Sequence, residues 1–255
     1  MLVRDQSKLR AACADMARAA VLAVDLETTG LDPLSDATLL IGVTDGLRTW
    51  LIDARAISRE DLGALLGPVL ERAPVVVMHH ARFDLRFLLS LGLKVGSPVD
   101  TMLIQKLIEN GRERGRLTLA ALTERLLGVT LDKSVQSSFV GHSDDVFTEA
   151  QLEYARRDLL ATYQVFMHQV GTLARDGLAE VAAIEACALN AFAAMEQTGL
   201  PVDVKAWRAL TDVAERDRAK ARAALDEIFR EVADLDLFRG VNINYDSDVE
   251  LKDHL

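Results

Sequence analysis

Short apolar runs alternate with segments of helical spacing along the first 175 residues. Four runs have the length of strands, at residues 20–26, 38–44, 49–53 and 75–78. Asp45-Gly46 separates the second run from the third and predicts a hairpin turn. Helical spacing predicts helices at 58–72, with a kink or break at Gly67-Pro68, and at 84–91, 101–109 and 118–127. This order predicts a mixed sheet covered by helices, an α/β fold.

The later part of the chain has the pattern of long helices. The clearest helix start is Thr148, because Thr148 and Gln151 form a capping-box pattern in front of an apolar stripe. This helix is expected to end near Ala174, where Asp176-Gly177 breaks it. Beyond it, spacing predicts helices at 178–196 and 204–233. We therefore expect an α/β domain over residues 1–175 and an all-helical extension over residues 176–255.

Composition and charge narrow the functional classes. With 255 residues, 50% of them hydrophobic, the chain can bury a sizeable core. No apolar run reaches the roughly 18 residues of a membrane span, and the first twenty residues lack a signal-peptide core, so we expect a cytoplasmic protein without a membrane partner. Cys13 and Cys187 fit no metal-ligand spacing and are expected to be buried, reduced thiols.

The formal net charge of −10 argues against a protein that coats nucleic acid. It permits an enzyme that holds only a few nucleotides, because bound metal ions then supply much of the positive charge that meets the phosphates.

Acidic residues at three places are candidates for a metal site. Asp25 and Glu27 flank an apolar residue, so on a strand both carboxylates point to one face, where a divalent cation relieves their repulsion. Asp84 opens a helix, where the macrodipole favours an ionised carboxylate. Tyr154 and Asp158 stand four residues apart and share one helix face. Each pattern alone is more often an ordinary surface feature, and only their combination indicates a metal site.

Together these residues resemble the motifs of the DEDD superfamily of 3′–5′ exonucleases, over roughly residues 18–172. That family has an acid pair on its first strand, an aspartate after a later strand, and Tyr-x-x-x-Asp on a late helix in its tyrosine subclass (DEDDy). The resemblance implies a ribonuclease H-like (DnaQ-like) mixed sheet. It also implies two divalent metal ions, Mg²⁺ or Mn²⁺, held by Asp25, Glu27, Asp84 and Asp158, with Tyr154 orienting the attacking water. The product would be a nucleoside 5′-monophosphate.

The same resemblance implies residues that bind the 3′ end of the substrate, namely Thr28, Leu31, His80 and Phe83. The family commonly has asparagine at the position of His80, and we favour histidine as a neutral hydrogen-bonding substitute over an altered grip or pH profile. Phe83 and Phe87 are candidate walls of the pocket for the terminal base, but their spacing equally suits core packing, which we favour. An arginine-rich loop is either a phosphate contact or a solvated loop and contains Arg112, Arg114 and Arg116.

The C-terminal part resembles the stretch that follows the exonuclease domain in family A DNA polymerases. The segment from Met195 to Asp203 and the long helix after it match the start of the polymerase thumb. The resemblance implies a proofreading exonuclease in DNA replication or repair, acting on single-stranded DNA 3′ ends. A polymerase domain or replication partner is implied as well.

Two alternatives remain open. The first is a ribonuclease D-like 3′–5′ exoribonuclease acting on RNA, because Leu131-Asp132-Lys133 with Gln136 and Ser138 resembles that branch. The basic helical domain usual there is not apparent, since residues 176–255 hold 17 Asp and Glu against 9 Lys and Arg. The second is a catalytically silent structural exonuclease module, which would predict lost acids, yet all four are present.

Overall fold

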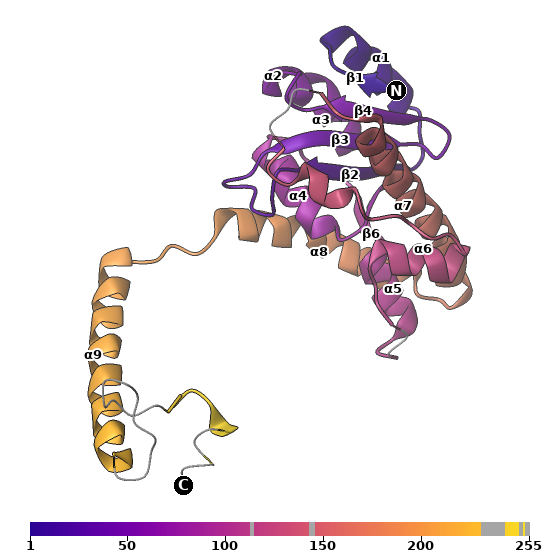
Figure 1. The fold of residues 1–255 in the computed structure, drawn as a ribbon. Helices are drawn as coiled ribbons and strands as arrows, with labels where there is room; N and C mark the ends of the chain where they lie inside the picture. Colours follow the sequence, from indigo (N-terminus) through magenta and orange to yellow (C-terminus); the bar gives the residue numbers. More distant parts are fainter. Residues whose placement is uncertain (113–114, 143–145, 231–242, 250–251, 253–255) are drawn as a thin grey trace. The chain divides into compact units, whose positions relative to one another are not determined.

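The computed structural model describes residues 1–112, 115–142, 146–230, 243–249 and 252 (Figure 1). Within them, six strands form one mixed sheet in the order β1-β4-β3-β2-β5-β6. The strands are β1 (Leu2–Val3), β2 (Leu22–Thr28), β3 (Thr38–Thr44), β4 (Thr49–Asp53), β5 (Val76–Met78) and β6 (Pro98–Asp100). Neighbours β2/β3 and β3/β4 are antiparallel, and the other pairs are parallel. The predicted mixed sheet is confirmed; the two edge strands, β1 and β6, are too short for periodicity to predict.

All the helices but the first lie close to predicted segments. They are α1 (Gln6–Met16), α2 (Arg59–Asp61), α3 (Gly67–Arg72), α4 (Ala81–Ser90), α5 (Thr101–Glu109), α6 (Leu119–Leu127), α7 (Glu149–Arg175), α8 (Ala179–Thr198) and α9 (Val204–Phe229), with a 3₁₀-helix η2 (Gln136–Phe139). No break occurs at Gly67-Pro68, because a π-helix η1 (Leu62–Leu66) joins α2 to α3 and Pro68 lies in the first turn of α3. The expected continuation of α9 to residue 233 lies outside the described residues.

Residues of β2 alternate between the two faces of the sheet. On one face a large apolar core forms with α1, α3 and α4, and β2 contributes Leu22, Val24 and Leu26. Asp25 and Glu27 point to the other face, across which α7 packs (Figure 1). Gly42 of β3 lies directly opposite Asp25, and a Cβ atom there would stand 2.4 Å from Leu159 Cδ1 of α7. The missing side chain therefore lets α7 approach the sheet closely beside the acid pair.

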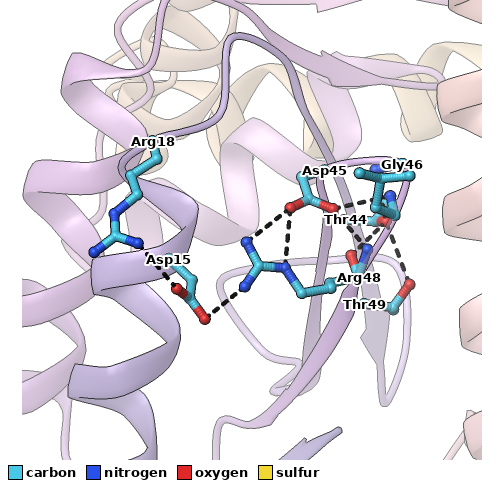
Figure 2. Close-up of polar contacts among 8 residues, drawn as sticks. Asp15, Arg18, Thr44, Asp45, Gly46, Arg48 and Thr49 are labelled. Carbon is cyan, nitrogen blue, oxygen red and sulfur yellow. Dashed lines mark hydrogen bonds and ion pairs between the residues drawn. The ribbon is translucent and has the colours of Figure 1, made fainter.

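The predicted hairpin between β3 and β4 is confirmed, and Figure 2 shows its turn. Asp45 Oδ1 accepts the backbone N–H groups of Leu47 (2.9 Å) and Arg48 (2.6 Å), while Gly46 adopts a φ of 86°. The guanidinium of Arg48 contacts the carboxylates of Asp45 (3.3 Å) and of Asp15 in α1 (2.8 Å). The turn is thus fixed by its own side chains and tied to α1.

The chain divides into two compact units, Met1–Gly199 and Leu200–Leu255. Helix α8 belongs to the first unit, where it packs against α4 and β6. Leu189 of α8 is buried there, and Arg82 of α4 pairs with Glu196 of α8 at 3.1 Å. The division therefore falls later than the boundary expected after residue 175, because α8 covers α4.

The second unit contains α9 and a short C-terminal stretch that contacts it. Tyr245 donates a hydrogen bond to Asp226 (2.7 Å), and its ring centroid lies 6.2 Å from that of Phe229. Arg218 pairs with Asp246 at 2.9 Å. These contacts hold the stretch against the C-terminal half of α9.

Two expectations from composition can be compared with the structure. Cys13 is buried in the core, whereas Cys187 is exposed on α8, so the prediction of two buried thiols is wrong for Cys187. Among the described helices, none combines the length and the apolar character needed to cross a membrane.

Candidate active site

One cavity of about 570 Å³ collects most of the predicted site residues. Its lining includes Asp25, Glu27, His80, Phe83, Asp84, Tyr154 and Asp158. Thr28 and Leu31 are outside this lining: Thr28 is buried and donates to the Gly30 carbonyl (2.6 Å), and Leu31 is 80% exposed. Their part in substrate binding stays a prediction.

The start of α4 is positioned by a neighbouring strand end. Asp100, the last residue of β6, accepts the backbone N–H groups of His80 (3.0 Å) and Ala81 (2.9 Å) through its two carboxylate oxygens. His80 is thereby held in a left-handed conformation with φ 63°, which is uncommon for a residue other than glycine. The chain then turns into α4, and Asp84 lies in its first turn, where the helix dipole favours a carboxylate.

Helix α7 supplies the remaining two motif residues. The predicted capping box is confirmed, because the Thr148 side chain accepts the Gln151 N–H (3.2 Å) and the Gln151 side chain accepts the Thr148 N–H (2.9 Å). Tyr154 and Asp158 follow on the helix face turned toward β2, and both are buried. The cap therefore fixes where the helix begins and, with it, the place of both side chains.

Glu27, Asp84 and Asp158 are buried and Asp25 is half-buried, and these carboxylates repel one another. Burial, with the charge of Asp158 added, raises the pKa of Asp25 to about 7. Burial also raises the pKa of Glu27 well above its ordinary value, as do the charges of Asp25 and Asp158. For Asp84, burial is again the largest cause of a raised pKa, followed by the charge of Asp25. Such a group of acids is stabilised in its ionised form by a bound cation.

The cavity also holds a cation that sequence reasoning did not assign to the site. Lys133 Nζ pairs with the Asp158 carboxylate, donates to Tyr154 Oη at 3.1 Å, and lies 5.1 Å from the centre of the tyrosine ring. Its charge lowers the pKa of Asp25 and of Glu27, against the effect of burial. From sequence, Leu131-Asp132-Lys133 is only a segment that resembles the ribonuclease D branch. Nothing in its spacing connects Lys133 to the acids.

The donor set fits hard divalent cations. Its oxygens belong to carboxylates on facing elements, the donor type that Mg²⁺ and Mn²⁺ prefer. Within the part of the chain that the structure describes, no three His, Cys, Asp or Glu side chains stand in an arrangement that could hold an ion. The Asp158 carboxylate instead pairs with Lys133. The types of residue therefore suit a metal site, and occupancy would require Asp158 to exchange its partner.

Residues beside the acids have separate environments. His79 is half-buried, with Nδ1 2.8 Å from Thr101 Oγ1, and desolvation lowers its pKa to about 4, so the ring is neutral at neutral pH. Phe83 lines the cavity, whereas Phe87 is fully buried in the core, with their ring centroids 5.0 Å apart. Among the loop arginines, Arg116 lines the cavity, and Arg114 lies outside the described residues.

Sequence comparison connects the chain to known nucleases. Residues 1–169 match the family model described as 3′–5′ exonuclease. DNA polymerase I of Aquifex aeolicus is 29% identical over 236 residues, which cover 86% of this chain and 38% of the polymerase. Ribonuclease D of Pseudomonas paraeruginosa is 28% identical over 167 residues, which cover 65% of this chain and 42% of the ribonuclease. The chain thus spans less than half the length of each relative.

Solved structures share the fold. Ribonuclease D of Escherichia coli, an exoribonuclease, superposes with a TM-score of 0.69 at 23% identity, covering 83% of this chain and 54% of the ribonuclease. NrnC of Brucella melitensis with bound Mg²⁺ gives a TM-score of 0.62 at 25% identity, covering 74% and 92%. The expected ribonuclease H-like mixed sheet is therefore confirmed. With a family match over most of its length, this chain belongs to the DEDD-type 3′–5′ exonucleases that resemble the proofreading domain of family A DNA polymerases.

Proposed function

We propose that this chain hydrolyses the 3′-terminal phosphodiester of single-stranded DNA with two divalent metal ions, Mg²⁺ or Mn²⁺, and releases nucleoside 5′-monophosphates. The proposal is carried by the convergence of four carboxylates and one tyrosine, from three elements far apart in sequence, on one cavity. The Mg²⁺ bound by NrnC supports the class of metal. Within this proposal, residues 1–175 are the exonuclease domain and residues 176–255 resemble the start of a polymerase thumb.

The acids have different parts in this proposal. Asp25, Glu27 and Asp158 would hold one ion, and Asp25 with Asp84 the other. The two ions, when bound, supply Lewis acidity that activates a water and stabilises the leaving 3′ oxygen. Asp25 is the shared ligand, which agrees with its place at the centre of the mutual repulsion among the acids.

Tyr154 orients the attacking water by a hydrogen bond. Burial and the negative charge of Asp158 raise the pKa of Tyr154 above its ordinary value, so the hydroxyl keeps its proton at neutral pH. It is therefore a hydrogen-bond donor and not a base. Phe83 and His80 line the same cavity and position the terminal nucleotide.

DNA is favoured as the substrate by the extent of the sequence similarity. The match to DNA polymerase I covers 86% of this chain, more than the exonuclease domain alone, whereas the match to ribonuclease D covers 65%. This difference supports a role in proofreading, replication or repair, with a polymerase domain or replication partner.

One observation favours RNA as the alternative substrate. Lys133 and Gln136, from the segment that resembles the ribonuclease D branch, both line the cavity. In the same segment, Ser138 accepts a hydrogen bond from Gln151 Nε2 at 3.1 Å, which ties it to α7. A silent structural module is disfavoured, since all four acids are retained.

A degradation assay tests the proposal. It uses single strands of DNA and RNA of matched sequence, labelled at the 5′ end, with Mg²⁺, Mn²⁺ or EDTA. We expect a ladder that shortens from the 3′ end only with metal, and faster on DNA. Asp25→Ala should abolish the ladder, while Asp212→Ala, an exposed acid on α9, should leave it unchanged. Faster degradation of RNA would favour the ribonuclease D-like alternative, and no degradation of either strand would leave the structural module.

A further inference from the structure

Lys133 places a partly exposed positive charge against a buried negative one. Its ammonium pairs with the Asp158 carboxylate and donates to Tyr154 Oη at 3.1 Å. The lysine side chain is 31% exposed, whereas that of Asp158 is 7% exposed. The ammonium ends a flexible four-carbon stem, so it can leave the carboxylate for solvent or another anion while Asp158 stays in place.

Local hydrogen bonds shape the backbone that carries Lys133, and the segment after it contacts α7. The Ser134 N–H donates to Asp132 Oδ1 (2.9 Å), and the Gln136 N–H donates to the Lys133 carbonyl (3.2 Å). The following 3₁₀-helix η2 contacts α7, since the ring centroids of Phe139 and Tyr154 lie 6.1 Å apart. A movement of the ammonium is therefore a change of side-chain conformation and needs no movement of the loop.

We propose that Lys133 is an exchangeable cation of this site: it holds the Asp158 carboxylate until a divalent ion takes that carboxylate, and then binds a phosphate of the substrate strand. The inference rests on the proposed function, because it requires Asp158 to be a metal ligand. Direct pairing with an ammonium and ligation of a divalent ion compete for the same carboxylate oxygens. With the carboxylates neutralised by bound divalent ions, the released ammonium would be attracted to a phosphate of the substrate.

A lysine whose main effect is to hold Asp158 in position makes the opposite prediction for metal binding. In that case Lys133 would help to shape the metal site, so its removal would weaken metal binding or leave it unchanged. Competition instead predicts tighter metal binding without the lysine and weaker binding of the strand. The two readings thus differ in the sign of one measurable affinity.

The test is calorimetric titration of Mn²⁺ into wild type, Lys133→Met, Lys133→Gln and the control Lys94→Met, an exposed lysine outside the cavity. We expect both Lys133 variants to bind Mn²⁺ on the order of tenfold more tightly than wild type. Lys94→Met should match wild type. Lys133→Gln keeps hydrogen-bonding capacity without charge, so it remains informative if Lys133→Met folds poorly.

A second titration follows labelled single-stranded DNA by fluorescence anisotropy, with Ca²⁺ in place of Mn²⁺. Both Lys133 variants should bind the strand several-fold more weakly than wild type. Unchanged or weaker Mn²⁺ binding in these variants, or unchanged binding of the strand, would overturn the exchange while leaving the nuclease proposal intact. If wild type does not bind Mn²⁺, the proposed metal site is wrong, and the exchange proposed for Lys133 is wrong with it.

Discussion

The two faces of the sheet are built from alternate residues of the same strands, and they carry different kinds of side chain. Toward α1, α3 and α4, β2 contributes to one continuous apolar core. Toward α7, the same strand contributes Asp25 and Glu27, and the apolar residues fall into smaller separate clusters. The period of two lets one strand stabilise the fold on one face and carry charge on the other. Stability and chemistry are therefore expected to respond to different substitutions.

Asp25→Asn should show the largest difference between an effect on activity and an effect on stability. Loss of the shared carboxylate is expected to lower kcat/KM about 10⁴-fold, because both proposed metal ions depend on it. In EDTA the variant should be at least as stable as wild type, since one half-buried charge that repels its neighbours is removed. Nuclease assays and thermal unfolding of the same samples measure both effects. A variant that loses stability together with activity would mean that Asp25 is structural.

Phe87→Ala should have the converse effect on the apolar face. Phe87 is fully buried, so truncation is expected to cost about 3–5 kcal/mol of unfolding free energy. The activity of the remaining folded molecules should stay close to that of wild type, because Phe87 is not in the lining of the cavity. Denaturant unfolding, with activity scaled to the folded fraction, checks this. A specific loss of activity would show that the core face shapes the site.

The acidic face should make stability depend on pH. The pKa of Asp25 is raised from 3.8 to about 7, so the folded protein binds the proton more tightly than the unfolded chain. In EDTA the unfolding free energy should therefore fall by about 2–4 kcal/mol as pH rises from 4 to 7. Asp25→Asn should flatten this slope, and Mn²⁺ should restore stability above pH 7. Stability that rises with pH over this window would contradict the described repulsion.

Gly42→Ala tests how closely α7 must approach the acid pair. The added Cβ would stand 2.4 Å from Leu159 Cδ1, so overpacking should cost about 1–3 kcal/mol. Displacement of α7 should also lower activity, because Asp158 is the residue next to Leu159. Gly171→Ala is the matched control in α7: no atom lies within 4 Å of its added Cβ, and alanine should stabilise the helix by up to about 1 kcal/mol. Equal activity of both variants would show that the spacing is not critical.

Sequence pattern predicted the elements better than the contacts between them. The capping box of α7 is a local signal and is confirmed, and the apolar residues of β2 at alternate positions, Leu22, Val24 and Leu26, share one core. Lys133 reaches Asp158 across 25 residues of sequence through an irregular segment, which no periodicity describes. The close approach of α7 at Gly42 depends likewise on tertiary packing. A glycine in a strand indicates that another segment can lie close to it, but not which segment. The pairing of α8 with α4 joins residues distant in sequence, so no local pattern predicts it.

His80 gives the smallest expected effect and concerns the loop that leads into α4. Asparagine adopts the left-handed conformation more readily than histidine, so His80→Asn should stabilise the protein by a few tenths of a kcal/mol, on the order of 0.5. His80→Ala should destabilise it by about 1 kcal/mol, because alanine lacks that tolerance. If the imidazole acts as a neutral hydrogen-bonding group, His80→Asn should keep activity within a few-fold of wild type, with the same pH–rate profile. A profile whose shape changes in His80→Asn would show that the imidazole contributes its charge to the reaction.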